Sequence, residues 1–284
     1  MKRLLVLLTA LAALCAALAG CAKTERGTRN AAAEMRVTFL DVGKGDCILI
    51  EQNGAFALID AGYADTAEDV IAFLREQGGE TLEAMIVTHY DKDHVGGASA
   101  VARAFAVKQL YLPGYEGSSK HYTALMAAVA EQEIPCQQVT EDVSFTLAEI
   151  GFTVFASDVA YVSGGEKEAN DNDVSLVVCA RYGKDSYLFA GDIEKPGISA
   201  YLAAGHGTFD VLKMPHHGGE EKNTDDFLAD VQPQIAVITD SADEPADEET
   251  LTLLAAAGAK TYRTSQTGAV TVVSSGEGTY RVKG

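Results

Sequence analysis

Apolar positions along this chain fall into short runs of strand length, and later runs alternate with stretches of helical spacing. The first runs cover residues 35–41, 46–51 and 55–60, with glycine or asparagine between them, as hairpin turns require. A helical pattern over 66–77 follows, and then a continuous apolar run over 84–87 that is typical of a buried strand. Further helices are predicted near 97–106, 120–132, 194–204, 223–230 and 247–257, and further strands near 108–112, 143–147, 151–156, 174–181, 186–190, 209–213, 234–239 and 269–273. Hairpins followed by strand–helix units favour an α/β domain with two sheets covered by helices.

The first twenty residues have the pattern of an export signal rather than of a folded element. A basic pair, Lys2 and Arg3, precedes a largely apolar run over residues 4–19, which is shorter than the ~20 residues that cross a bilayer as a helix. The run leads into L-A-G-C, which ends at Cys21 and resembles the bacterial lipobox. We therefore expect residues 1–20 to be a lipoprotein signal peptide and Cys21 to be lipidated. Ordinary secretion after the apolar run is the alternative.

Residues 21–33 lack periodicity and are expected to form a tether between the membrane and a folded domain over residues 34–284. The protein is expected outside the cytoplasm, as a bacterial lipoprotein anchored to the cell membrane, because two acyl chains suffice for stable anchoring. Beyond the tether the cysteines are Cys47, Cys136 and Cys179, and core packing is the expected role of each.

Composition and charge exclude several classes of protein. At 47% hydrophobic residues the chain is neither disordered nor fibrous. A formal charge of −19 excludes a protein that wraps nucleic acid through a broad basic face, but not an enzyme that engages one phosphodiester through metal ions. The acidic loop 240–249 is expected to be solvated. Lys44, Lys92 and Lys213 either add positive charge at the mouth of a site or lie as solvated surface side chains.

The strongest chemical signal is T-H-Y-D-K-D-H-V-G-G over residues 88–97, directly after a buried apolar run. His89 and Asp91 point the same way in extended backbone, and a turn at Asp93 and His94 can bring two more ligands to the same point. The glycine pair lets the backbone pack closely. Imidazole with carboxylate suits zinc, and the share of carboxylates leaves manganese open. A solvated charged loop that caps the next helix is the alternative.

Two later apolar runs also end in candidate ligands. The run over 186–190 leads to Asp192, which is either a ligand or the N-cap of the next helix. A second run leads to His216 and His217. Four of the six histidines, at positions 89, 94, 216 and 217, therefore lie at strand ends, and this clustering favours one shared site.

Taken together, the motifs resemble those of metallo-β-lactamase-fold hydrolases, and in particular the exported nuclease-like domain of the competence DNA-uptake channel (ComEC type). In order, they are F-L-D-V-G-K-G-D (39–46), L-I-D-A-G (58–62), T-H-Y-D-K-D-H-V-G-G (88–97), N-D-V-S-L-V-V (172–178), F-A-G-D (189–192), L-K-M-P-H-H-G-G (212–219) and Y-R-T-S-Q-T-G-A-V (262–270). The resemblance covers residues 34–274. It implies an αββα sandwich, in which two mixed sheets are flanked by helices and metal ions bind at the sheet edges.

The resemblance also implies roles for individual residues. Six metal ligands are implied for two ions: His89, Asp91, Asp93, His94, Asp192 and His217. Asp192 would bridge the two ions, with His89 and Asp91 on the second. His216 and Asp93 would act in catalysis, His216 by pointing at a phosphoryl oxygen, although the adjacent histidines 216 and 217 could exchange roles. Four further residues would support the ligands: Asp46, Asp60, Asn172 and Ser175.

The chain departs from the family pattern at three places. The commoner pattern has a histidine where Asp91 stands and another in a middle motif, whose region here holds Asn172 and Ser175. These two departures leave the second ion with fewer strong ligands. A late histidine-containing loop of the competence domain corresponds here to S-A-D-E-P-A-D over 241–247, without the histidine. Asp60 also has a simpler explanation as a turn residue at a strand end.

These features predict a lipid-anchored, extracytoplasmic, metal-dependent hydrolase, specifically a phosphodiesterase or nuclease. One or two zinc ions, or manganese, would generate a metal-bound hydroxide near neutral pH. The expected partners are a phosphodiester-containing substrate, either nucleic acid or a cell-envelope polymer, and the membrane through the lipid anchor; no protein partner is predicted. Ester, lactam or lactone hydrolysis by the same fold is the first alternative. A non-catalytic lipoprotein that binds metal or a wall component is the second.

Overall fold

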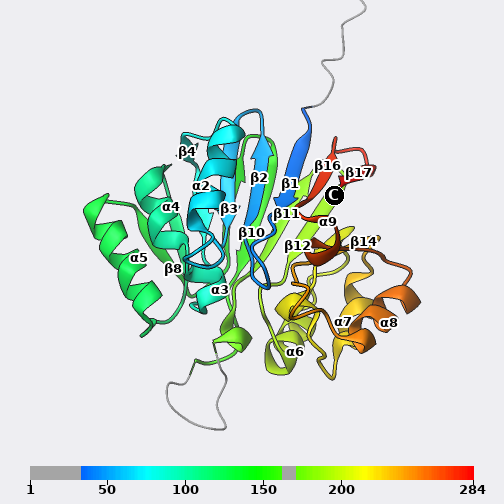
Figure 1. Ribbon diagram of the computed structural model, residues 1–284. Helices are drawn as coiled ribbons and strands as arrows, with labels where there is room; N and C mark the ends of the chain where they lie inside the picture. Colours follow the sequence, from blue (N-terminus) through cyan, green and yellow to red (C-terminus); the bar gives the residue numbers. More distant parts are fainter. Residues whose placement is uncertain (1–32, 162–170) are drawn as a thin grey trace, which may run out of the picture. The chain divides into compact units, whose positions relative to one another are not determined.

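Two mixed β-sheets form the centre of the computed structural model, which describes residues 33–161 and 171–284 (Figure 1). The first sheet has eight strands, in the order β17 (Tyr280–Lys283), β16 (Val270–Ser274), β1 (Met35–Phe39), β2 (Ile48–Gln52), β3 (Ala55–Ile59), β5 (Ala84–Ile86), β7 (Leu110–Pro113) and β8 (Cys136–Val139). The second has seven, in the order β15 (Lys260–Arg263), β14 (Ile235–Ile238), β13 (Val211–Lys213), β12 (Asp185–Phe189), β11 (Val177–Tyr182), β10 (Ile150–Phe155) and β9 (Val143–Leu147). A short parallel pair joins β4 (Thr81–Leu82) and β6 (Ala106–Val107).

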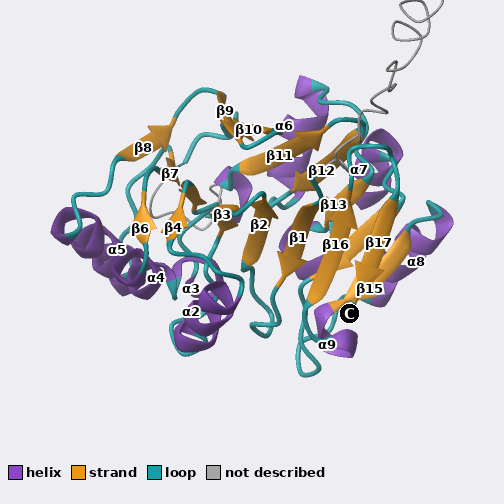
Figure 2. Cartoon of the chain, turned by 90° about the horizontal axis from the view of Figure 1, so that it is seen from above, coloured by secondary structure: helices purple, strands orange, loops and turns teal. Residues whose placement is uncertain are grey.

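Helices cover the outer face of each sheet (Figure 2). Those beside the first sheet are α2 (Ala67–Glu76), α3 (Lys92–Val95), α4 (Ala98–Ala104) and α5 (Lys120–Glu131), and those beside the second are α6 (Lys195–Ala204), α7 (Thr224–Val231) and α8 (Glu248–Ala256). Shorter elements are α9 (Thr264–Thr267) and two 3₁₀ turns, η1 (Asn172–Val174) and η2 (Pro215–Gly218). This arrangement confirms the predicted αββα sandwich.

Alternation along the strands sorts side chains between the layers. In β2, Ile48 and Ile50 pack into the core between the sheets, whereas Leu49 packs beneath the helices of the first sheet. In β12, Phe189 lies in the same central core and Leu188 packs beneath the helices of the second sheet. Each such fully buried side chain contributes about 1.5–3 kcal/mol relative to exposure, so both faces of each sheet stabilise the sandwich.

In the two large sheets, the three strands that the apolar pattern did not predict, β8, β15 and β17, all lie at the edges. Their sequences are C-Q-Q-V, K-T-Y-R and Y-R-V-K, which carry polar or charged residues at half or more of their positions. An edge strand has a solvated side and is protected from wrong pairing by charge, so it lacks the apolar run of a central strand. The pattern therefore identifies the centre of each sheet better than its edges.

Two side chains depart from their predicted environments. Cys47 and Cys179 are buried as expected, but Cys136 is exposed because it lies on an edge strand. The acidic loop 240–249 is largely exposed as predicted, except that Asp240 is fully buried, where its carboxylate forms an ion pair with Arg263. Burial of this carboxylate is compensated by a cation, as the cost of an unpaired charge requires.

The predicted signal peptide and the lipidation site Cys21 lie outside the described residues. Within residues 33–161 and 171–284, no helix is both long and apolar enough to cross a membrane. The lipid anchor therefore stays a prediction.

The carboxyl ends of strands from both sheets carry the polar residues of the candidate site. β3 and β5 run parallel and lead to Asp60 and to the 88–97 motif. In the second sheet β12, β13 and β14 are parallel neighbours and lead to Asp192, His217 and Thr239. Parallel strands bring such ends to one edge of a sheet, where ligand sites of α/β proteins form.

Candidate metal centre

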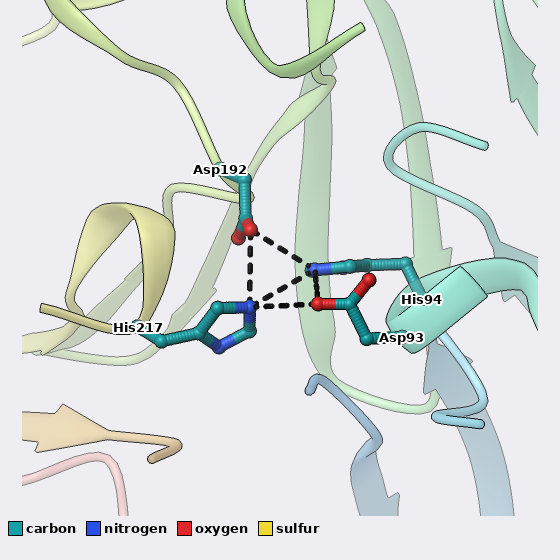
Figure 3. A group of neighbouring side chains, drawn as sticks. All are labelled: Asp93, His94, Asp192 and His217. Atoms are coloured by element: carbon teal, nitrogen blue, oxygen red, sulfur yellow. Dashed lines mark hydrogen bonds and ion pairs between the residues drawn. The ribbon is translucent and has the colours of Figure 1, made fainter. Parts of the chain in front are cut away.

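Four side chains converge at these strand ends: Asp93, His94, Asp192 and His217 (Figure 3). The Nε2 atoms of His94 and His217 are 3.3 Å apart, and Asp192 Oδ2 is 3.2 Å from the first and 3.0 Å from the second. Asp93 Oδ2 is 3.4 Å from His217 Nε2 and 3.9 Å from His94 Nε2. Ligand atoms around a tetrahedral ion bonded at about 2.1 Å are roughly 3.4 Å apart, so the spacing fits a metal ion.

The peptide that carries Asp93 and His94 is held by backbone contacts with the first sheet. The N–H of Asp46 donates to the carbonyl of Asp93 at 3.1 Å, and the N–H of Ala61 donates to the carbonyl of His94 at 2.9 Å. A Cβ atom on Gly97 would lie 2.3 Å from the carbonyl oxygen of Ala61. Any side chain at Gly97 would therefore push this segment away, which confirms the close packing predicted for the glycine pair.

Left-handed backbone separates the two adjacent histidines. His216 and His217 have φ values of 45° and 52°, which non-glycine residues rarely adopt. His217 thereby points into the cluster, whereas His216 Nδ1 faces Glu194 Oε1 at 3.6 Å and Glu221 Oε1 at 3.9 Å. The structure thus brings His217, and not His216, to the other ligands. Strained backbone of this kind is typical of functional sites, where side chains must point in defined directions.

The orientation of His94 is fixed by Asp60, which lies at the end of β3 and is fully buried. Asp60 Oδ2 is 2.8 Å from His94 Nδ1, and the same carboxylate accepts from the N–H and the hydroxyl of Thr88 at 2.8 and 2.7 Å. Because a carboxylate accepts, His94 carries its proton on Nδ1 and presents Nε2 to the cluster. A carboxylate behind a ligand histidine is typical of metal sites, so the predicted supporting role of Asp60 agrees with this geometry.

His217 is oriented through a hydroxyl. Thr239 Oγ1 donates to Asp46 Oδ1 at 2.6 Å and lies 3.1 Å from His217 Nδ1. The single proton of the Thr239 hydroxyl is used in the hydrogen bond to Asp46. In the contact with His217 the hydroxyl oxygen must therefore accept, so Nδ1 of His217 carries a proton. Nε2 of His217 therefore also faces the cluster. The predicted supporting role of Asp46 agrees with this geometry, but the sequence analysis missed Thr239, because an isolated threonine after a strand gives no signal.

The other half of the predicted centre is less complete. His89 is fully buried, and its Nε2 has no hydrogen-bond partner among the described residues, whereas Asp91 is 52% exposed with Oδ2 3.9 Å away. Thr88 Oγ1, which donates to Asp60, lies 3.1 Å from His89 Nδ1 and so accepts a hydrogen bond from the Nδ1–H of His89. His89 thus presents an unpartnered Nε2, as a ligand would. Within residues 33–161 and 171–284, no group of three or more adjacent ligand-type side chains includes His89 or Asp91.

Two opposing effects determine the pKa values in the cluster: burial disfavours the charged forms, and close contact with opposite charges favours them. Burial would raise the pKa of Asp192, but His217, His94 and Lys213 lower it well below its ordinary value. Burial lowers the pKa of His94, yet Asp192 and Asp60 raise it well above the ordinary value. For Asp93, hydrogen bonding to His217 and the charge of His94 outweigh burial and lower the pKa to about 2. The protein without metal thus pairs buried carboxylates with imidazolium, and a metal ion would displace those protons.

The outer pair shows the opposite tendency. Burial, the proximity of Asp93 and the proximity of Asp171 raise the pKa of Asp91 to about 6. Burial and the charge of His94 lower the pKa of His89 well below its ordinary value. For Asp91, burial and the neighbouring carboxylates thus outweigh the attraction of the His94 charge, and His89 is a neutral imidazole.

The remaining predicted residues lie around the cluster. Ser175 Oγ accepts from the N–H of Asp192 at 3.4 Å and so contacts a ligand loop as predicted. Asn172 instead donates from Nδ2 to Glu194 Oε1 at 2.8 Å. Lys213 is neither at the mouth of the site nor solvated, because its side chain is fully buried. Both alternatives for Lys213 are therefore wrong.

The donor set fits a divalent metal ion. Two imidazoles and two carboxylates converge, and each imidazole is held by its other nitrogen. Exposure is uneven: the side chains of His94, His217 and Asp192 are 0, 1 and 4% exposed, whereas Asp93 is 18% exposed. Solvent therefore reaches the cluster from the side of Asp93.

Comparisons with known proteins agree with the fold. ComE operon protein 3 of Bacillus subtilis (strain 168) is 27% identical over 261 residues, which are 84% of this chain and 33% of that protein. Recombination protein 2 of Haemophilus influenzae is 29% identical over 212 residues, which are 72% of this chain and 24% of that protein. The chain thus spans a third or less of the length of these relatives.

A solved structure has the same architecture. Igni18, described as a metallo hydrolase from the archaeon Ignicoccus hospitalis, aligns with a TM-score of 0.54 over 84% of this chain and 98% of its own, at 14% identity. The family profile of the metallo-beta-lactamase superfamily matches residues 40–238, which include all four residues of the cluster. This chain belongs to the metallo-beta-lactamase superfamily.

Proposed function

We propose that this protein is a metal-dependent phosphodiesterase of the cell exterior, held to the membrane by a lipid on Cys21. The observation that carries the proposal is the convergence of Asp93, His94, Asp192 and His217 in ion-binding geometry. A phosphodiester substrate is supported by the relatives, one of which is named a recombination protein. The export signal and the L-A-G-C sequence support the location.

The cluster explains how an acidic protein could accept an anionic substrate. A bound divalent ion would activate water, orient the phosphoryl group and offset its charge. Asp192 and the two imidazoles are too deeply buried to meet substrate, so their part is to hold the ion. Asp93, the most exposed of the four, borders the open side, and its low pKa keeps it ionised at neutral pH. Positive charge would thus be local to the ion, and the acidic surface would not need to attract the substrate.

His216 is the remaining candidate for contact with substrate. Its ring is 29% exposed and is not among the four clustered ligands. If His216 donates to a phosphoryl oxygen, His216→Ala should lower turnover on the order of 10²–10³-fold, as for a lost oxyanion donor. Its metal content should equal that of wild type. His206→Ala is the matched control, because His206 packs against Phe155 and Tyr201 instead.

The test is hydrolysis of a substrate panel by purified mature protein. The panel contains bis-p-nitrophenyl phosphate, DNA, an ester, a β-lactam and a lactone, each with metal, with chelator, and with metal restored. We expect cleavage of phosphodiesters only, abolished by chelator and absent in Asp192→Asn. Cleavage of the lactam, lactone or ester instead would overturn the substrate class. A metal-loaded protein that cleaves nothing would indicate a binding lipoprotein.

The anchor is tested independently of the chemistry. Mass spectrometry of the mature amino terminus should find a diacylated cysteine at position 21, and Cys21→Ala should release the protein from membranes. An unmodified mature terminus in the wild-type protein would contradict the proposed location without affecting the proposed reaction.

A further inference from the structure

A fully buried lysine lies directly behind the candidate metal centre. Lys213 Nζ is 2.5 Å from Asp46 Oδ2 and 3.2 Å from Asp192 Oδ1, and it donates to the carbonyl of Gly191 at 3.0 Å. An ammonium group has three N–H donors and no acceptor. All three donors therefore have partners, and none is left for a substrate.

The fold places this lysine between two ligand-bearing strands. Lys213 is the last residue of β13, where it pairs with Phe189 of β12 and with Val237 of β14. β12 leads to Asp192, and β14 leads to Thr239. The ammonium group of Lys213 can thus contact the candidate ligand Asp192 directly. It can reach the other candidate ligand, His217, only through neighbouring side chains.

Asp46 connects the lysine to the second ligand. Its Oδ2 contacts Lys213, and its Oδ1 accepts the hydroxyl proton of Thr239 at 2.6 Å. Thr239 Oγ1 then lies 3.1 Å from His217 Nδ1. Asp46, Lys213 and Thr239 are 1, 0 and 0% exposed, so solvent cannot substitute for any of these contacts.

We propose that Lys213, Asp46 and Thr239 are positioning residues that act as one support chain for the metal centre. Lys213 occupies Oδ1 of Asp192, so that this carboxylate presents Oδ2 alone to the cluster. The same ammonium holds Asp46, which sets the Thr239 hydroxyl and thereby the Nδ1-protonated form of His217. The inference rests on the metal-binding part of the proposed function and is independent of the substrate.

A purely structural role predicts a different outcome. If the three residues only fill the core, changing them would lower the stability of the protein without metal and leave its metal site unaltered. The support chain requires metal affinity and ligand geometry to change, because residues that orient metal ligands typically alter affinity by about 10–100-fold. Metal affinity and the spectrum of bound cobalt therefore separate the two roles.

The first test compares Thr239→Val with Thr239→Ser in the mature protein. Valine keeps the volume of threonine and removes the hydroxyl, whereas serine keeps the hydroxyl. Thr239→Val should bind Zn²⁺ about 10–100-fold more weakly in a competition titration, and Thr239→Ser should bind as wild type does. Thr38→Val is the matched control, because the buried Thr38 hydroxyl hydrogen-bonds to Thr271 in the first sheet and not to the metal cluster. Equal affinity in Thr239→Val and wild type would overturn the proposal.

The second test examines the lysine itself. In Lys213→Met, Asp192 can turn Oδ1 toward the cluster, so the absorption spectrum of bound Co²⁺ should shift toward higher coordination and affinity should fall. A wild-type spectrum with wild-type affinity in this variant would contradict the assigned role of Lys213. If Lys213→Met does not fold, the Thr239 pair decides the proposal alone. Because these readouts use Zn²⁺ and Co²⁺ without substrate, failure of the proposed phosphodiesterase activity would be seen separately.

Discussion

The two halves of the candidate metal centre differ in depth, in ligand number and in support. The deep half consists of Asp93, His94, Asp192 and His217, in which both imidazoles are held from behind and three of the four side chains are almost fully buried. The outer half consists of His89 and Asp91, of which Asp91 is half exposed.

The two halves therefore differ in how far their charges and polar atoms are compensated before a metal ion binds. In the deep half the carboxylates already have cationic partners, so their charge is compensated before an ion arrives. In the outer half Asp91 has a raised pKa, and His89 Nε2 has no partner among residues 33–161 and 171–284, so both side chains reduce the stability of the folded protein until a ligand binds them. We therefore expect the deep half to bind the first ion and the outer half to bind more weakly.

The largest effect is expected from Asp192→Asn. Asparagine keeps the volume and an acceptor for Lys213, but it removes the charge that faces both imidazoles. Affinity for the first ion should fall by more than about 100-fold, the upper end of the range for residues that merely support ligands. Metal content after dialysis and phosphodiesterase rate measure the effect, and circular dichroism checks the fold. A variant that retains both metal and turnover would remove Asp192 from the deep half.

Two histidine variants, His94→Ala and His89→Ala, test whether the two halves bind metal independently. His94→Ala should abolish the first binding event, because His94 is one of the four residues of the deep half. His89→Ala should leave the first event intact and remove only the weaker second event, because His89 is not one of those four residues. The measurement is metal stoichiometry and affinity by calorimetry on both variants. Loss of the first event in His89→Ala would show that the halves are not separable.

A smaller effect, on the thermal stability of the metal-free protein, is expected from Asp91→Asn. Its pKa is raised from the ordinary 3.8 to about 6 in the folded protein, so the folded state holds this proton more tightly than the unfolded state. The wild-type protein therefore loses stability as pH rises from about 4 to about 6, relative to a variant that cannot ionise there. Asp91→Asn should raise the melting temperature of the metal-free protein above pH 6 and leave it unchanged near pH 4.

The control for this effect is Asp41→Asn, an exposed aspartate that is not among the candidate ligands. Differential scanning fluorimetry across pH 4–8 in the presence of chelator gives both melting curves. A gain of the same size at every pH would show that ionisation of Asp91 is not its source.

The fold and the deep half could be predicted because both follow local patterns. Central strands such as β2 and β12 have apolar runs, and the motifs that contain His94 and His217 come after such runs. The edge strands β8, β15 and β17 could not be found in this way, since a solvated edge has no apolar pattern.

The residues behind the ligands were harder to predict because their roles depend on distant partners. Asp46 and Thr239 are 193 positions apart in the sequence, and their contact exists only once the two sheets have packed. Lys213 ends a buried strand, and a lysine at that position is usually solvated at its charged end, so its three internal acceptors could not be foreseen. The resemblance implied His217 as the ligand but left an exchange with His216 open, because the left-handed backbone that directs His217 into the cluster has no sequence signal.

The most direct test of the central claim is calorimetric titration of the metal-free wild-type protein with Zn²⁺ alone. The geometry predicts two unequal binding events, the tighter at one equivalent for the deep half and the weaker at the second for the outer half. Two equally tight ions would contradict the difference between the halves, and no binding at all would contradict the assignment of a metal centre.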